Sequence, residues 1–270
     1  MTDEKTIVKK DSTEVELKVK KAIKIQDLVK SDVIIKSAER TLGKRGQQFL
    51  TSVLALANSS PDIAECEAYS IYNSCLTAAT LNLPINKNLG FAHIVPYKNT
   101  KKGGIKEAQF QMGWKGFVQL AMRSGEFKTI GVREVKKDEL IGLDEFTGEP
   151  IFKFNLDSAE EVIGYMAYFR LNNGFEKAFY MSIANIDSHA KKYSKSYQRG
   201  YGLWADNFDA MAQKTVIKLL LSKFAPLSTD MITAIEEDQK VGNEYVDNPK
   251  ESTLTVEPID IEVTEREETK

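Results

Sequence analysis

Hydrophobic residues recur at helical spacing through the first third of the chain. In the stretch 45–57, one face of a helix would carry Phe49, Val53, Leu54 and Ala57. Ser60-Pro61 is typical of a helix cap followed by a first-turn proline. The same spacing predicts helices over three other ranges: 22–30, 32–42 and 65–81.

The period changes to that of β-strands after residue 90. Residues 91–112 predict a β-hairpin with a polar, glycine-containing loop. A short helix then begins at Trp114, with Phe117, Val118 and Ala121 on one face, and Gly125 is placed to end it. Further strands are predicted over three ranges: 127–137, 162–171 and 175–181. Asn172-Asn173-Gly174, between the last two, is a strong hairpin-turn signal.

The last third predicts a long amphipathic helix over 205–223. Its buried stripe would hold Phe208, Met211, Ala212, Thr215, Leu219 and Leu220. A short helix over 229–238 follows. The order of elements predicts an α+β fold with a mostly antiparallel sheet. We expect a flexible N-terminus over 1–21, one domain over 22–240 and a disordered tail over 241–270.

Charge is unevenly distributed along the 270 residues, although the net charge is only −2. From Glu236 to the end there are 12 acids and 4 bases, so the remainder carries 33 bases against 27 acids. This asymmetry has two interpretations of equal weight. The basic body could bind an anionic partner, or the acidic tail could simply keep the protein soluble. No apolar run is long enough to span a membrane and no signal peptide is seen. We therefore expect a cytoplasmic protein in which Cys66 and Cys75 are reduced.

Motifs for covalent chemistry are not found in the sequence. Gly43-Lys44 is followed by Arg45, which does not fit a nucleotide-binding P-loop. The two histidines, His93 and His189, are far apart, and the paired acids at 160–161 and 236–237 have no third partner at useful spacing. We predict no catalytic residue, no metal ligand and no cofactor.

Three clusters of basic residues are interleaved with aromatic and amide side chains. The hairpin cluster holds Lys98, Lys101, Lys102, Lys106, Gln109 and Gln111. The short helix contributes Lys115, Gln119, Met122 and Arg123 on a face away from Trp114. The third cluster joins the segment 191–204 to the long helix and holds Lys191, Lys192, Tyr193, Lys195, Tyr197, Arg199, Tyr201, Asn207, Lys214 and Lys218. We expect Asn207, Lys214 and Lys218 to lie on one stripe opposite the apolar one.

This mixture is what binding of single-stranded nucleic acid without sequence preference requires. Lysines and arginines neutralise phosphates and release counterions, and aromatic rings stack on any base. Each feature also has a plainer interpretation. Tyr193 and Tyr197 could lie at the edge of a core, Trp114 and Trp204 favour packing roles, and surface lysines are often only solvated. The convergence of three clusters favours nucleic-acid binding.

Two blocks of sequence carry a resemblance to a known family. "QFQMGWKGFVQLAMRSGEFKTI" (Gln109–Ile130) resembles the central motif of the RecT family of phage single-strand annealing proteins. "WADNFDAMAQKTVIKLLL" (Trp204–Leu221) resembles the second block of that family. The resemblance covers residues 22–238 and is strongest to members from prophages of Gram-positive bacteria.

The resemblance implies a fold, an activity and partners. The fold would be a curved antiparallel sheet with a β-hairpin finger, packed on a central helix and flanked by N- and C-terminal helices. Such proteins bind single-stranded DNA, anneal it to a complementary strand without ATP, and assemble into rings or helical filaments. Expected partners are a phage exonuclease and, through the C-terminal region, the host single-strand-binding protein. By motif, the DNA groove would include Gln109, Gln111, Lys115, Arg123, Lys214 and Lys218, with the basic hairpin as a finger along it.

Three other functions remain open at this point. A passive single-stranded-DNA-binding protein would hold a strand without annealing it. A metal-dependent nuclease would need converging carboxylates, and an interaction scaffold would show no salt-dependent affinity for DNA.

Overall fold

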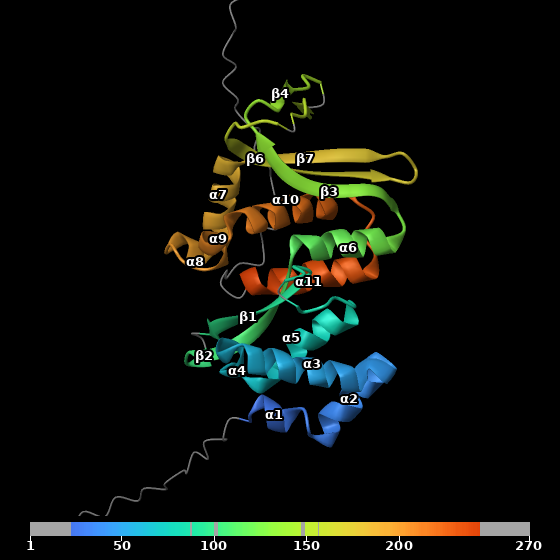
Figure 1. Cartoon of the computed structure of the whole chain (residues 1–270), viewed down its shortest axis with the longest axis vertical. Coiled ribbons are helices and arrows are strands. Elements are labelled where there is room, and N and C mark those ends of the chain that lie inside the picture. Colours follow the sequence, from blue (N-terminus) through green and yellow to red (C-terminus); the bar gives the residue numbers. More distant parts are fainter. Residues whose placement is uncertain (1–22, 87, 100–101, 147–148, 156, 244–270) are drawn as a thin grey trace, which may run out of the picture. The chain divides into compact units, whose positions relative to one another are not determined.

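The computed structural model describes residues 23–86, 88–99, 102–146, 149–155 and 157–243 (Figure 1). By internal contacts the chain divides into two compact units, residues 1–110 and 111–270. The predicted α+β class is confirmed, because helices and antiparallel sheets both contribute to the fold. The expected flexible N-terminus over 1–21 lies outside the described residues. The expected tail over 241–270 also lies outside them, apart from residues 241–243, which are the end of a helix.

The first unit is built mainly of helices. Its helices are α1 (Ile25–Leu28), α2 (Asp32–Leu42), the 3₁₀ turn Gly43–Arg45, α3 (Gly46–Ser59), α4 (Pro61–Ala64) and α5 (Ala68–Thr80). Its core includes Val53, Ile71 and Tyr72, and the Tyr72 ring meets Phe49 edge-on at 5.7 Å. Gly46 begins α3 where a Cβ would come within 2.9 Å of the Glu39 backbone, so α2 and α3 approach closely there.

The predicted β-hairpin is present as β1 (Ala92–Asn99) and β2 (Ile105–Met112). Two glycines of the turn, Gly103 and Gly104, have φ of 71° and 84°, a backbone conformation that other residues rarely adopt. Serines of α5 hold the outer edge of β2. Ser70 Oγ accepts from the Ala108 amide and Ser74 Oγ donates to the Ala108 carbonyl, both at 2.8 Å.

The second unit contains a three-stranded antiparallel sheet in the order β3-β6-β7. Its strands are β3 (Phe127–Lys136), β6 (Val162–Leu171) and β7 (Glu176–Ser182). Alternate residues of β6, namely Tyr165, Ala167, Phe169 and Leu171, are buried. The short helix α6 (Trp114–Ser124) precedes the sheet and ends at Gly125 with φ of 77°, as predicted.

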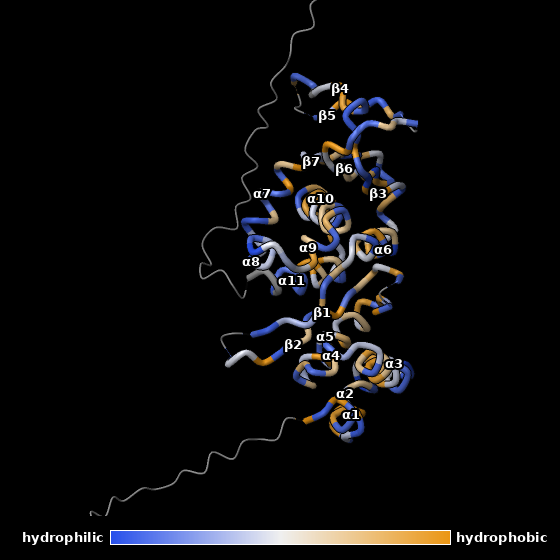
Figure 2. Tube along the Cα trace, turned by 60° about the vertical axis from the view of Figure 1, so that its left-hand side comes forward, coloured by the Kyte–Doolittle hydropathy of each residue, from blue (hydrophilic) through white to orange (hydrophobic). Residues whose placement is uncertain are grey.

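The C-terminal part of this unit is helical. It consists of α7 (Ile183–Tyr193), α8 (Lys195–Gln198), α9 (Leu203–Asp206), α10 (Phe208–Phe224) and α11 (Thr229–Asn243). Helix α10 packs against all three strands of the sheet and also against α6 and α9 (Figures 1 and 2). It is therefore buried on several sides rather than along one stripe. The predicted single helix over 205–223 is wrong in one respect, since it is interrupted at Asn207.

A small hairpin in the second unit was not predicted. It comprises β4 (Leu140–Leu143) and β5 (Pro150–Phe152). Leu140 and Phe152 pack against a cluster of Val135, Met166 and Tyr180. At the start of this segment the buried Glu139 pairs with Arg133 and accepts a hydrogen bond from the Lys136 amide at 2.9 Å. These contacts fix the way the chain leaves β3.

Two further observations concern the described residues alone. None of their helices is long and apolar enough to cross a membrane. Cys66 and Cys75 are both free and buried, and burial raises the pKa of the Cys66 thiol to about 11 and that of Cys75 to about 12.

Candidate nucleic-acid interface

One buried carboxylate joins the two sequence blocks that carry the family resemblance. Asp238, on α11, accepts hydrogen bonds at Oδ1 from the Lys214 ammonium (2.6 Å) and from the Met112 main-chain amide (3.1 Å). Its Oδ2 accepts from the Lys218 ammonium at 3.0 Å. Met112 ends β2, and the two lysines are four residues apart on α10. Residues about 100 positions apart in the sequence therefore meet at one group.

The electrostatics of this cluster are those of a compensated buried ion pair. Burial disfavours the charged carboxylate, but the ammonium groups of Lys214 and Lys218 outweigh it and hold the pKa of Asp238 below its usual value. Burial acts in the opposite direction on Lys214 and lowers its pKa, against the attraction of Asp238. With both lysines protonated and Asp238 ionised, the cluster carries a net charge of +1.

The position of Lys214 differs from the sequence-based expectation. Its side chain is 10% exposed and lies among the buried residues of α10, so the prediction that it lies on a polar stripe is wrong. The physical reason is that α10 is packed on more than one side and that Asp238 supplies a buried counter-charge. Lys218 is 21% exposed and Asn207 is exposed, so these two are closer to the predicted arrangement. A DNA-binding role for the three residues remains a prediction.

Helix α7 brings further basic residues close to Lys218. Burial lowers the pKa of His189 to about 4, and the nearby positive charges of Lys218 and Lys192 act in the same direction. The His189 ring lies 4.6 Å from the Tyr193 ring, and the Lys192 ammonium lies 5.5 Å from the centre of the same tyrosine ring. Basic residues of α7 and α10 are thus neighbours within the second unit.

The three tyrosines of the segment 191–204 are in different environments. Tyr197 donates a hydrogen bond to Asp187 Oδ1 at 2.8 Å, and its ring lies 5.9 Å from the buried Trp204. Tyr193 and Tyr201 are 43% and 55% exposed. Tyr197 and Trp204 therefore pack inward, while Tyr193 and Tyr201 keep ring surface available for stacking.

The predicted cations of this segment lie mainly at the surface. Lys191 pairs with Asp187 at 2.6 Å and remains 60% exposed on its side chain. Lys192, Lys195 and Arg199 are also exposed. The Lys191 carbonyl accepts a hydrogen bond from Gln198 Nε2 at 2.5 Å, which ties α8 to the end of α7. The structure therefore gathers cations and two accessible rings on α7, α8 and the following turn.

The α6 cluster is divided between surface and interior. Lys115 is exposed, with its ammonium 5.6 Å from the centre of the Trp114 ring, and Arg123 is exposed near the end of the helix. Gln111, which comes just before α6, is only 7% exposed. Lys115 and Arg123 are thus accessible to an anion, whereas the Gln111 side chain is buried.

In the first unit, acidic residues accompany the hairpin lysines. Lys102 pairs with Glu107 at 2.7 Å, and Lys106 pairs with Glu65 at 2.5 Å and with Asp62 at 3.5 Å. Hydrogen bonds from Lys102 and from the Asn99 amide lower the pKa of Glu107. The net positive charge of the hairpin is therefore smaller than its lysines alone suggest.

Three hairpin residues complete the predicted set. Lys98 is exposed at the end of β1, and Lys101 lies outside the described residues. Gln109 is partly buried, and its side-chain oxygen is enclosed without a hydrogen-bond partner in the described structure. An unsatisfied amide oxygen on a predicted interface strand is notable because buried polar atoms are normally paired.

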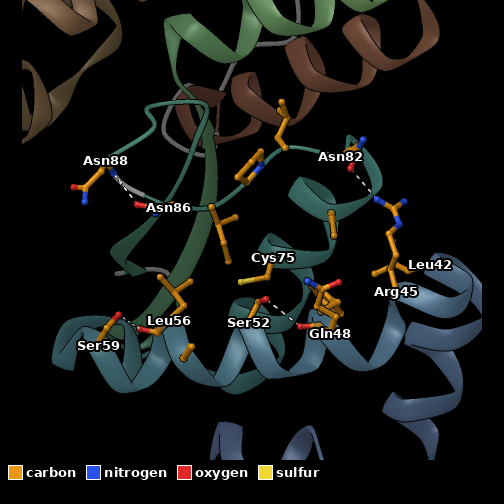
Figure 3. Close-up of a pocket in the computed structure, with 16 residues that line it drawn as sticks. Leu42, Arg45, Gln48, Ser52, Leu56, Ser59, Cys75, Asn82, Asn86 and Asn88 are labelled. Atoms are coloured by element: carbon orange, nitrogen blue, oxygen red, sulfur yellow. Dashed lines mark hydrogen bonds between the residues drawn. The ribbon is translucent and has the colours of Figure 1, made fainter.

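A cavity of about 810 Å³ lies in the first unit, between α3, α5 and the segment that follows α5 (Figure 3). Its wall combines apolar side chains such as Leu56 with amides such as Gln48 and Asn82, and Asn82 accepts a hydrogen bond from Arg45 at 2.8 Å. Arg45 is the charged residue among its described lining residues. Of the predicted DNA-binding residues that the structure describes, none lines this cavity.

Sequence reasoning missed Asp238, Asp187 and the Met112 amide. A signal for Asp238 was present, because it continues the spacing of the buried Met231, Ala234 and Ile235 along α11. An acid in an apolar stripe indicates a buried cationic partner. Among the described residues, no group of three or more His, Cys, Asp or Glu side chains is placed to hold a metal ion.

Exposed cations beside accessible aromatic rings are typical of proteins that bind nucleic acid without sequence preference. Comparison with known proteins defines the class further. The model of the RecT family matches residues 47–253, more than half of the chain, and the chain belongs to that family.

Two curated proteins are similar to this chain over most of its length. The protein named "Uncharacterized protein YqaK" of Bacillus subtilis (strain 168) is 42% identical over 245 residues, which cover 91% of this chain and 82% of that protein. "Protein RecT" of Escherichia coli (strain K12) is 27% identical over 214 residues, which cover 75% of this chain and 71% of that protein. Membership of the RecT family supports a role in DNA recombination by single-strand annealing.

Proposed function

We propose that this chain is an ATP-independent annealing protein that binds single-stranded DNA along a basic surface, assembles on it with copies of itself, and pairs it with a complementary strand. Phosphates would be neutralised by the predicted cations on α6, α7, α8 and α10, a set that does not include Lys223, and exposed rings would stack on bases. A strand held by its backbone keeps its base edges free for pairing. No covalent step is part of this proposal.

The observation that carries the proposal is the meeting of both family blocks at the Asp238 cluster. Met112 belongs to the first block, and Lys214 and Lys218 belong to the second. Lys218 is the member of the cluster that reaches the surface furthest, and it lies near the basic residues of α7. The expected partners are an exonuclease that supplies single strands and, through the C-terminal region, a host single-strand-binding protein.

The proposal is tested by adding two labelled complementary oligonucleotides in sequence to purified protein, without ATP and over a range of salt concentrations. We expect pairing much faster than without protein, with both strands retained in a large complex. Binding of the first strand without faster pairing would indicate a passive single-strand-binding protein.

A matched pair of lysine variants on α10 tests where DNA lies. Lys218→Gln should weaken binding of oligonucleotides of every sequence and reduce the salt dependence of binding. Lys223→Gln removes an exposed lysine from the same helix, outside the predicted set, and should leave both unchanged. Equal effects of the two variants would mean that DNA does not run past Lys218.

A further inference from the structure

The three side chains of the Asp238 cluster differ in how far they reach toward solvent. The side chains of Asp238, Lys214 and Lys218 are 2%, 10% and 21% exposed. Only Lys218 therefore offers a phosphate oxygen substantial access. Lys214 already directs its ammonium at the carboxylate, 2.6 Å away.

The charges of the cluster explain why a second, buried lysine is needed. A carboxylate paired with Lys218 alone would cancel the charge of that lysine, and a phosphate would meet a neutral pair. With Lys214 on the other carboxylate oxygen, two ammonium groups face one carboxylate. The surplus positive charge then lies on the side that Lys218 presents to solvent.

Hydrogen bonding also fixes the position of the carboxylate. Oδ1 is held by the Met112 amide at 3.1 Å as well as by Lys214, so Oδ2 is left for Lys218. Met231, Ala234 and Ile235 bury the same face of α11 and hold the helix in place. Asp238 is therefore a fixed acceptor on which a flexible lysine side chain is oriented.

We propose that Lys214 and Asp238 are positioning residues of the DNA-binding surface, with Lys214 acting through Asp238 as an internal counter-charge that leaves Lys218 with a full positive charge for a phosphate. This inference rests on the proposed function, since it concerns how the same surface meets DNA. It differs from the expectation that Lys214 itself contacts a phosphate. Lys214 influences DNA binding without touching DNA.

The test compares the salt dependence of oligo(dT) binding among charge variants of the full-length protein. Lys214→Met keeps a buried side chain of similar length but lets Asp238 cancel Lys218. The slope of log affinity against log salt should then fall by about 0.7, the value for one phosphate contact with a single strand. Adding Asp238→Asn removes the cancelling charge, so Lys214→Met/Asp238→Asn should regain the slope of the natural protein. The slope of Lys218→Gln should also be lower by about 0.7, and adding Asp238→Asn to this variant should not restore it.

If the double variant has the same low slope as Lys214→Met, the proposal is overturned. That result would mean that Lys214 itself contacts a phosphate, because removing Asp238 cannot restore a lost contact. If the natural protein shows no salt-dependent binding of oligo(dT), the proposed function is overturned instead. Thermal unfolding of each variant shows whether it is folded before its slope is compared.

A second measurement needs no substitution. Amine acetylation of the natural protein, read by mass spectrometry with and without oligo(dT), should modify Lys218 in the free protein and less in the complex. Lys214 should stay unmodified in both, and the exposed Lys223 should react in both. Modification of Lys214 in the free protein that DNA then prevents would contradict the inference.

Discussion

Lys214 on α10 and Asp238 on α11 form a buried ion pair, with Nζ and Oδ1 2.6 Å apart. The same carboxylate also accepts from Lys218 and from the Met112 amide. A pair of this kind holds α11 to α10 and to the end of β2. It also makes the two lysines of the second family block unequal, because one is fixed in the interior and the other reaches the surface.

Removing the carboxylate alone should destabilise the protein strongly. Asp238→Ala leaves the Lys214 charge buried without a partner, which costs about 3–5 kcal/mol in free energy of unfolding. Urea unfolding followed by circular dichroism measures this change. Glu236→Ala, on an exposed position of the same helix, should change the free energy by less than about 0.5 kcal/mol. A loss below about 1 kcal/mol for Asp238→Ala would show that the pair is not needed to hold α11.

Substitutions of two tyrosines in the segment 191–204 should have different effects, one on DNA affinity and the other on protein stability. Tyr201 is 55% exposed, so Tyr201→Ser should weaken oligo(dT) binding by about 1–3 kcal/mol without lowering the melting temperature. Tyr197 donates to Asp187 and packs near Trp204, so Tyr197→Phe should cost about 1 kcal/mol of stability. Fluorescence anisotropy and thermal melts measure the two effects.

A control for the stacking experiment is available in the first unit. Tyr69 is 46% exposed on α5 and lies outside the predicted interface. Tyr69→Ser should leave oligo(dT) affinity unchanged. If it weakens binding as much as Tyr201→Ser, the effect does not come from stacking at the proposed surface.

Elements with strong local signals were predicted from the sequence. Gly125 ends α6 in the left-handed conformation, and Asn172-Asn173-Gly174 joins β6 to β7, with Gly174 at φ of 91°. In both cases the residue type itself selects the backbone conformation, so no knowledge of the tertiary structure is needed.

Elements defined by tertiary contacts were not predicted. Helix α7 buries only Ile186 and Ala190, too few positions to show a helical period. The hairpin of β4 and β5 is short, and an irregularity between Leu140 and Gly142 interrupts its alternation. The burial of Lys214 depends on a carboxylate 24 residues later in the chain. A pattern confined to α10 could not reveal that partner.

The acidic partners of the hairpin lysines predict the effect of a single neutralisation. Glu107 offsets the charge of Lys102 in the free protein. Glu107→Gln keeps one oxygen, which can accept from the Asn99 amide or from Lys102, and it raises the net charge of the hairpin by one. If DNA contacts the hairpin, affinity for oligo(dT) should rise and its salt dependence should steepen by up to about 0.7.

The comparison for that measurement is an acid elsewhere on the surface. Glu160→Gln changes the net charge equally at an exposed position outside the predicted clusters. A larger effect from Glu107→Gln than from Glu160→Gln would place the strand along the hairpin. Equal effects would mean that affinity depends only on the overall charge of the protein, which would contradict a contact between DNA and the hairpin.

The low pKa of His189 predicts a loss of stability in mild acid. Burial and the nearby Lys218 and Lys192 lower the pKa of His189 from 6.5 to about 4. Between these values the unfolded chain binds a proton that the folded protein does not, so the free energy of unfolding falls as pH falls. The contribution from this group is at most about 1.4 kcal/mol per pH unit in that window and disappears above about pH 6.5.

Urea unfolding at pH 7 and pH 5 tests this dependence. His189→Phe keeps a ring beside Tyr193 but cannot bind a proton, so it should lose about 2 kcal/mol less than the natural protein between the two values. If His189→Phe loses as much stability as the natural protein between pH 7 and pH 5, the ring at 189 is protonated in the folded state. Repulsion between His189 and its lysine neighbours would then be too weak, even together with burial, to keep the ring neutral.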